Sequence, residues 1–481
     1  MKKQLLLTIG FFCLLVLSPI VKAQTSITIE EISYPISIVE TLPVTPDVTY
    51  TRYDIPDFPL KFSVLRIDRR AQDLKIEAWS GLDYTFAGKE HPQDVSVRKT
   101  TNDFEVIAAI NGDFFGSFPC AAEMVQGELS QRVLSPEFCV DGDDCSPHIA
   151  FDADNKPLID VMRFNPYVAH LDGKKYDVNS VNNSWRGENF LNIYNAYYES
   201  EQTTTNEWGV EYLVAPVGGR WLPDENGNIT CVIEKIRAIG DVNKLDIEKG
   251  KAVLSGHGEA RTFLEEAGLG DEIYVNWGAY LDDNPGISNF TNLVGGNTIC
   301  LKNSVAQPYG PTDGDREKMR HPRTAVGYSN DGNYVYFYVV DGRQTGMAGV
   351  TTRELADICK FAGADIALNL DGGGSSSMVV NGVIKNSAFE RRDVVNGLLV
   401  AKTSGSSDIK IVAKDTTADA ITVIRTESGL QAQFTGTATI MLYDLRGCLL
   451  DKTKATDSYS RVLHRGIYII QVNGKAIKVV L

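Results

Sequence analysis

The sequence predicts an α+β fold of mixed, largely antiparallel sheets with short helices, followed by a small C-terminal β-sandwich. Alternating apolar and polar residues, typical of strands, recur along the chain, and Asp-Gly or Asn-Gly dipeptides separate consecutive strand-like runs. Helical spacing is confined to short stretches and is absent from the C-terminal tail. A content of 43% hydrophobic and 23% charged residues excludes a collagen-like, coiled-coil or largely disordered chain.

The 481 residues are too many for one ordinary core and suggest two to four folded units. The tail is set off by a Ser/Gly-rich stretch of linker composition. The expected segments are a signal peptide (1–23), an extended lead-in with one strand (24–59), a main domain (60–402), a linker (403–408) and the sandwich (409–481).

The N-terminus has the pattern of a secretory signal. Lys2 and Lys3 precede an apolar run from Leu5 to Leu17, and cleavage is expected before Gln24. We therefore expect export to the periplasm, the cell surface or the medium, and no membrane span. A net charge of −15 disfavours binding to nucleic acid or anionic lipid.

Cysteines and acidic residues gather in one loop. An oxidising compartment would permit one disulfide among Cys120, Cys139 and Cys145, whose pairing stays open. The acidic stretch Asp141–Asp144 could hold calcium, although a solvated loop is the favoured interpretation. We expect no required cofactor, and the sequence leaves a metal requirement undecided.

The main domain begins with two alternating runs, Leu60–Ile67 and Leu74–Trp79, which suggest a strand pair with one buried face. A later apolar strand runs into Asn111-Gly112. Its end could present the amide of Asn111 to a ligand, but a plain Asn-Gly turn is the favoured interpretation of this stretch alone.

A hairpin is expected further on, from Arg323–Tyr328 and Tyr334–Val340 around an Asp-Gly turn. Folding about that turn would bring Arg323 and Asp341 to one open end, where a cation and a carboxylate flank the same mouth. A helix follows, with a capping box from Thr351 to Glu354 and a C-terminal cap at Gly363.

The next strand, Ile366–Leu370, ends in Asp371, three glycines and three serines. Glycines allow positive φ and close approach of backbone N–H groups to anionic oxygens. A tight turn capped by its own Asp would explain Asp-Gly-Gly-Gly alone, whereas the complete run favours a site. The spacing fits neither a phosphate loop nor a hydrolase nucleophile elbow. A hairpin around Asn381-Gly382 follows.

Together, these segments resemble the phosphodiester glycosidase family, over roughly Leu60 to Lys402. The family motif varies at position 113, so Asp113 is not selected as catalytic. The matching segments are Asn111–Phe115, Arg323–Gly327, Asp341–Arg343, Glu354–Leu355, Gly363–Ala364 and Ala367–Ser376.

The resemblance implies hydrolysis of a sugar 1-phosphodiester, such as an N-acetylglucosamine 1-phosphodiester, or of a phosphate-linked glycan, releasing sugar and phosphomonoester. It implies Asp371 as the catalytic carboxylate, Asp341 as second choice, and Arg323 as the phosphate clamp. A non-catalytic module that binds anionic carbohydrate is the alternative. The implied substrate-binding residues are Asn111, Thr324, Arg343, Asn369, Gly372, Gly373, Gly374, Ser375 and Ser376.

The tail is expected to form short strands, and it resembles the C-terminal sorting domains of Bacteroidetes secretion. That resemblance implies an exported bacterial protein and export machinery as a partner. The expected strands are Ile409–Val412, Ile421–Thr426, Leu430–Phe434, Thr439–Tyr443 and Gly466–Val472.

Overall fold

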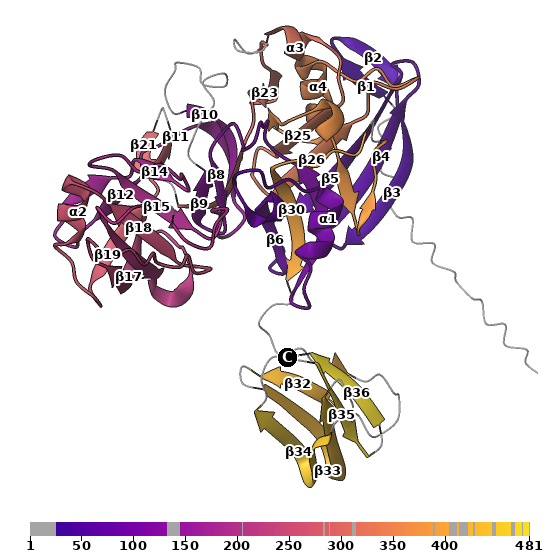
Figure 1. Cartoon of the computed structure of the whole chain (residues 1–481). Helices are drawn as coiled ribbons and strands as arrows, with labels where there is room; N and C mark the ends of the chain where they lie inside the picture. The colour runs from indigo at the N-terminus through magenta and orange to yellow at the C-terminus, as the bar shows by residue number, and fades with distance from the viewer. Residues whose placement is uncertain are drawn as a thin grey trace, which may run out of the picture.

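A computed structural model describes residues 26–131, 145–203, 205–281, 284–287, 289–309, 314–387 and 390–403, and in the tail 411–412, 422–426, 429–444, 449–462, 467–473 and 475–480 (Figure 1). The expected signal peptide, Cys139, the Asp141–Asp144 loop and most of the expected linker lie outside these residues. The disulfide expected among Cys120, Cys139 and Cys145 therefore stays a prediction.

The first lobe contains the strands within residues 26–111 and 298–403. Its largest sheet has eight antiparallel strands in the order β24-β23-β27-β25-β26-β5-β4-β3. Many of its side chains are apolar on both faces, which indicates a sheet covered on both sides. The strands are β3 (Ser37–Thr45), β4 (Val48–Ile55), β5 (Leu60–Asp68), β23 (Thr298–Lys302), β24 (Val305–Ala306), β25 (Arg323–Tyr328), β26 (Tyr334–Val340) and β27 (Ile366–Asn369).

A five-stranded antiparallel sheet, ordered β29-β28-β7-β30-β6, packs against one face of this sheet. Ile67 and Val339 of the larger sheet meet Ile110 and Leu398 of the smaller one in a shared buried core. The strands are β6 (Leu74–Ser80), β7 (Phe104–Asn111), β28 (Met378–Val380), β29 (Val383–Ile384) and β30 (Asn396–Thr403).

Helix α4 (Thr352–Ala362), with strands β1 (Ser26–Ile29) and β2 (Ile32–Pro35), covers the other face of the larger sheet. Helix α1 (Pro92–Arg98) covers the outer face of the smaller sheet, where Val95 packs in a cluster with Trp79 (Figure 1). The first lobe is therefore layered, and its two sheets meet in the middle.

The second lobe contains two further sheets around a core of their own, with helix α2 (Glu259–Leu264). The seven-stranded sheet contains β21 (Asn284–Ile287), β20 (Ala279–Leu281), β11 (Pro157–Phe164), β10 (Cys145–Asp152), β22 (Phe290–Gly295), β8 (Glu123–Val125) and β9 (Glu128–Gln131). The eight-stranded sheet contains β13 (Lys175–Asp177), β12 (Tyr167–Ala169), β19 (Glu272–Asn276), β17 (Asn228–Arg237), β16 (Val210–Pro216), β18 (Ala252–Gly256), β15 (Leu191–Asn195) and β14 (Ser180–Val181).

The tail forms a hydrogen-bonded sheet with its own core. Its long strand β33 pairs with β32 in its first half and with β35 in its second, and the register shifts between Gln433 and Thr437. Leu430 and Ile440, from the two halves, share the core. The strands are β31 (Ile411–Val412), β32 (Thr422–Thr426), β33 (Gly429–Asp444), β34 (Leu449–Val462), β35 (Ile467–Val472) and β36 (Lys475–Val480).

The mixed, largely antiparallel architecture confirms the predicted fold class. The hairpins β25–β26 and β28–β29, the strand β27 and the capping box at Thr351 are all present. Cys231, Cys300 and Cys359 are buried thiols. None of the helices in the described part of the chain is long and apolar enough to cross a membrane.

Two local expectations are wrong. Strands β5 and β6 are not a pair: β5 pairs with β4 and β26, whereas β6 pairs with β30 in the other sheet. The chain changes layer between them, so β5 is buried on both faces, as Val64 and Leu65 illustrate. The lead-in holds four strands instead of one, because β3 and β4 extend the larger sheet.

The N-terminal cap of α4 should make a measurable contribution to stability. Thr351→Val keeps the shape of the side chain but removes the oxygen that accepts from Glu354 N, so it should lower the free energy of unfolding by about 1 kcal/mol. Thr351→Ser keeps the oxygen and serves as the control. Equal stability of the two variants in urea denaturation would contradict this role of the cap.

Candidate active site

The turn from Asp371 to Ser377 lies where strands of both sheets of the first lobe end. Leu370 N donates to Thr324 O at 2.9 Å, and Asp371 N donates to Gly112 O at 2.9 Å. The turn is thereby bonded to β25 on one side and to the end of β7 on the other. A short 3₁₀ helix, η4 (Gly373–Ser375), lies within it.

Glycine is required at two positions of this turn. Gly373 has φ of +61°, which favours glycine. At Gly372 a Cβ would lie 2.6 Å from the carbonyl oxygen of Pro322. The turn thus runs directly against the chain that precedes β25.

The side chain of Asn111 joins three segments at this place. Its Nδ2 donates to the carbonyl oxygen of Asp371 at 2.7 Å. Its Oδ1 accepts from Thr324 Oγ1 at 2.7 Å and from Ser377 N at 3.1 Å. Asn111 and Thr324 are both fully buried. We expected these two residues to bind the substrate. In the structure, their polar side-chain atoms instead bond to each other and to the turn.

Asp371 is half-buried at the start of the turn, and its Oδ1 accepts from Gly372 N at 2.8 Å. Burial raises the pKa of Asp371 to about 6, against the lowering effects of that hydrogen bond and of the charges of Arg392 and Arg323. A carboxyl with this pKa changes its charge near neutral pH, as a general base or acid must.

A second carboxyl, not selected from the sequence, lies nearby. Asp113 is buried and accepts a hydrogen bond from Ala121 N at 2.7 Å. Burial, with a smaller contribution from the negative charge of Asp371, raises the pKa of Asp113 to about 7. The position of Asp113, two residues after Asn111, was the signal in the sequence that could have identified it.

The guanidinium of Arg323 extends away from the turn. Its Nε donates to Val350 O at 3.1 Å, and its Nη2 donates to Arg316 O at 2.8 Å and Met319 O at 3.1 Å. Arg316 lies in α3 (Gly314–Lys318) and Met319 directly follows this helix, whereas Val350 lies outside it. Arg323 is buried, and its hydrogen bonds anchor these segments behind the site. Its positive charge also lowers the pKa of Asp371.

Two other arginines lie beside the glycines. A Cβ on Gly373 would lie 2.9 Å from Nη1 of Arg343, an exposed residue whose Nη2 lies 3.2 Å from His321 Nδ1. A Cβ on Gly374 would first meet the carboxylate of Glu390, whose Cδ would be 2.6 Å away, and would lie 2.8 Å from Cζ of Arg392, which is ion-paired with Glu390. Arg343 was expected at the site, whereas Arg392 and Glu390 were missed because they lie in a loop without a recognisable motif.

Asp341 is occupied by a different partner. Its Oδ2 accepts from Arg52 Nη2 at 2.5 Å, and its Oδ1 accepts from Ser387 N at 2.9 Å. Arg52 also donates to Lys385 O at 2.7 Å. Register places Arg323 and Asp341 at the same end of the β25–β26 hairpin, as expected, yet their side chains bond to separate segments.

Several polar atoms around the turn are buried without a hydrogen bond in the described part of the chain. Ser376 Oγ and Asn369 Oδ1 have no partner there, although Asn369 Nδ2 donates to Asn297 Oδ1 at 2.7 Å. Ser375 Oγ lowers the pKa of Asp371 without an aligned bond to it. Buried groups of this kind normally have a partner, so they point to a polar ligand or water at the turn.

Comparison with known proteins now adds to this geometry. Residues 236–401 match the model of the phosphodiester glycosidase family. The matched segment includes β25, β27 and the turn, but it does not include Asn111 or Asp113. The match supports the family suggested by the sequence and a function of the phosphodiester glycosidase kind.

Individual relatives are distant. An uncharacterized SPbeta prophage-derived protein, YomE, of Bacillus subtilis (strain 168) is 34% identical over 92 residues, which are 19% of this chain and 14% of that protein. A hypothetical protein from Synechocystis aligns with a TM-score of 0.52 and 16% identity, over 76% of this chain and 64% of its own. This likeness supports the fold alone. The chain thus spans less than two thirds of either protein.

A further solved structure is the zebrafish N-acetylglucosamine-1-phosphodiester alpha-N-acetylglucosaminidase catalytic domain, auto-inhibited by its pro-peptide. It aligns with a TM-score of 0.35 and 14% identity, over 78% of this chain and 88% of its own. That score is too low to carry an argument about this chain.

No three His, Cys, Asp or Glu side chains come together as metal ligands within the described ranges. The Asp141–Asp144 loop, where calcium was considered, is outside them.

The bond between Asn111 and Thr324 can be tested by a double-mutant cycle. Asn111→Ala, Thr324→Val and the double variant should show a coupling of about 1 kcal/mol in the free energy of unfolding, because the same Asn111–Thr324 hydrogen bond is lost in all three. Urea denaturation gives the four stabilities. Strictly additive losses would contradict the hydrogen-bonded link.

Proposed function

We propose that the protein is a glycosidase that hydrolyses a sugar 1-phosphodiester, such as an N-acetylglucosamine 1-phosphodiester, at the turn Asp371–Ser377. The observation that carries the proposal is a pair of carboxyls, Asp371 and Asp113, whose raised pKa values lie near neutrality at a glycine turn flanked by Arg343 and Arg392. The match to the phosphodiester glycosidase family supports the same reaction class.

In this reaction, water attacks the anomeric carbon and the bond from that carbon to the phosphate oxygen breaks. The electron pair of that bond leaves with the phosphomonoester. Asp371, as carboxylate, accepts the proton of the attacking water and stabilises the positive charge that develops on the sugar. A phosphomonoester is a good leaving group, so one activated carboxylate suffices. Asp113 stays neutral below about pH 7, which avoids a second negative charge near Asp371.

The phosphate of the substrate would bind on the exposed side of the turn. We assign its charge to Arg343 and Arg392, because guanidinium groups bind phosphate oxygens through two N–H groups at once. The Ser375 and Ser376 hydroxyls, together with the N–H of Gly374, complete the phosphate site. The N–H groups of Gly372 and Gly373 already donate within the protein, to Asp371 Oδ1 and to Pro322 O.

The remaining residues implied by the resemblance take supporting roles in this proposal. Asn111 and Thr324 position the turn, Arg323 supplies a buried positive charge behind it, and Asp341 anchors the segment at Ser387. Asn369 offers the sugar an unpartnered Oδ1. We also propose export, on the basis of the signal-like residues 1–23 and the sorting-domain-like tail.

The pH dependence of turnover should follow the two carboxyls. Activity should rise through pH 6, where Asp371 becomes a carboxylate, and fall above pH 7, where ionised Asp113 adds a second negative charge that repels the anionic substrate. Asp371→Asn should lower kcat at least about a hundredfold. Asp113→Asn should remove the fall at high pH.

Asp172→Asn, which removes an exposed carboxyl of the second lobe, is the control and should retain the wild-type profile. The measurement is kcat for an N-acetylglucosamine 1-phosphodiester between pH 4 and 9. Undiminished turnover by Asp371→Asn would exclude it as the catalyst. Saturable binding without turnover by the wild type would favour the carbohydrate-binding module instead.

The arginines can be separated by comparing charged and neutral substrates. Arg343→Ala and Arg392→Ala should each raise KM for the phosphodiester about tenfold and leave KM for a neutral aryl glycoside unchanged. Arg323→Ala should mainly lower stability, since its side chain binds backbone carbonyls. Arg353→Ala, on the exposed side of α4, is the control. An equal effect on both substrates would refute the phosphate contacts.

A further inference from the structure

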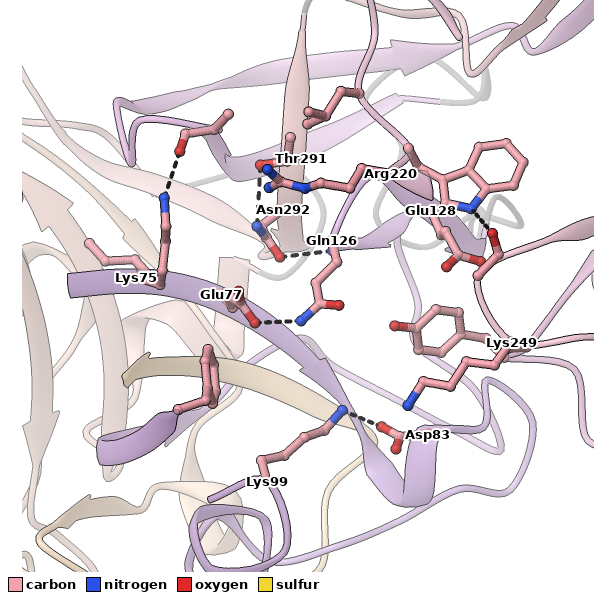
Figure 2. A pocket seen from close by; sticks show the side chains of 18 of the residues that line it. Lys75, Glu77, Asp83, Lys99, Gln126, Glu128, Arg220, Lys249, Thr291 and Asn292 are labelled. Carbon is pink, nitrogen blue, oxygen red and sulfur yellow. Dashed lines mark hydrogen bonds and ion pairs between the residues drawn. The ribbon is translucent and has the colours of Figure 1, made fainter. Parts of the chain in front are cut away.

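A cavity of about 850 Å³ lies away from the turn, between β6 on one side and the β8–β9 hairpin, η3 (Val217–Gly219) and residues 249–250 on the other (Figure 2). Its volume is in the range of small-molecule sites. Phe104, the first residue of β7, lines it, whereas Asn111, the last, contacts Asp371. Eight residues of strand at ~3.3 Å each separate the two places.

Two exposed cations line this cavity without an ion pair among the described residues. Arg220 and Lys249 are exposed, and neither has a carboxylate partner within 4.0 Å among the described residues. Both nevertheless act on the cavity, because the charge of Lys249 lowers the pKa of Glu128 and that of Arg220 lowers the pKa of Glu77. Four carboxylates line the cavity as well, but two exposed cations on separate segments can attract one anionic group in a chain of net charge −15. The carboxylates are Glu77, Asp83, Glu128 and Asp152.

The β8–β9 hairpin, on the same side of the cavity as Arg220 and Lys249, offers hydrogen-bonding groups. Glu128 is 8% exposed, and its Oε2 has no hydrogen-bond partner within the described part of the chain. Figure 2 shows the Glu128 carboxyl on the side of Lys249, whereas the Arg220 guanidinium lies beside Thr291 and Asn292, with Gln126 between Glu128 and that guanidinium. Gln126 Nε2 donates to Glu77 Oε2 at 2.8 Å. Burial raises the pKa of Glu128 to about 7, so this carboxyl can accept from or donate to a hydroxyl.

Apolar surface completes the lining. Tyr84 and Leu222 are 44% and 40% exposed and can cover one face of a sugar ring. The carboxyls of Glu77 and Glu128 would repel a polyphosphate, but they match the hydroxyl donors of a sugar. The lining therefore favours a ligand with several hydroxyls and a single anionic group.

We propose that this cavity binds an acidic sugar, either a uronate or a sugar phosphate, with the anionic group on Arg220 and Lys249 and hydroxyls on Glu128 and Gln126. The site is independent of the hydrolysis proposed at Asp371. It would hold an acidic residue of a glycan while another part of the same polymer, or another molecule, is bound elsewhere on the protein.

The test is calorimetric binding to the full chain with three probes: trigalacturonate, glucose 6-phosphate and the neutral trisaccharide maltotriose. At least one anionic probe should bind saturably and at least tenfold more tightly than maltotriose, and the probe that binds identifies the source of the charge. Arg220→Ala/Lys249→Ala should weaken this binding at least tenfold.

The control Lys302→Ala/Lys360→Ala removes the same charge from exposed positions on β23 and α4 that do not line the cavity, and it should bind as the wild type does. Asp371→Asn should also leave binding unchanged. Absence of saturable binding by both anionic probes, equal binding of maltotriose, or loss of binding in Asp371→Asn but not in the double variant would overturn the proposal. Lys249→Ala alone, with an intermediate loss, gives a second variant should the double variant fold poorly.

Discussion

The amide of Asn111 is the contact on which the geometry of the candidate site depends. It bonds the end of β7 to Thr324 in the other sheet and to both ends of the glycine turn, at Asp371 and Ser377. Gly112 adds two backbone bonds, to Asn396 O and from Asp371 N. In a buried setting each unmade bond would leave a costly polar group, so the two sheets and the turn have one favoured arrangement. Asp113 directly follows Gly112 in the chain and Asp371 directly follows Leu370, so these backbone bonds fix the positions of both carboxyl-bearing residues.

Charges at the site are divided between buried and exposed positions. The half-buried Arg52 bonds to Asp341 and the buried Arg323 bonds to backbone carbonyls, so both hold segments in place. Arg343 and Arg392 lie beside Gly373 and Gly374, where a ligand would approach. In a chain of net charge −15, these two exposed arginines supply the local positive charge that an anionic substrate would need at the turn.

Local signals in the sequence were sufficient for elements whose determinants are close together in the chain. The Asp-Gly hairpin, the Thr351–Glu354 capping box and the turn after β27 are of this kind. The separation of β5 from β6 was not predictable, because alternation does not say which partner a strand will choose. The direction of the Arg323 side chain depends on α3 and Val350, and the approach of Arg392 depends on a loop without a pattern.

In the proposed reaction, water attacks the anomeric carbon and not the phosphorus atom. Hydrolysis of an N-acetylglucosamine 1-phosphodiester in ¹⁸O-labelled water tests it, with ³¹P NMR of the released phosphomonoester as the measurement. We expect a phosphomonoester whose ³¹P resonance carries no ¹⁸O isotope shift, because attack at carbon leaves all the phosphorus–oxygen bonds of the product intact. A shifted resonance would mean cleavage between phosphorus and oxygen, and the protein would then be a phosphodiesterase.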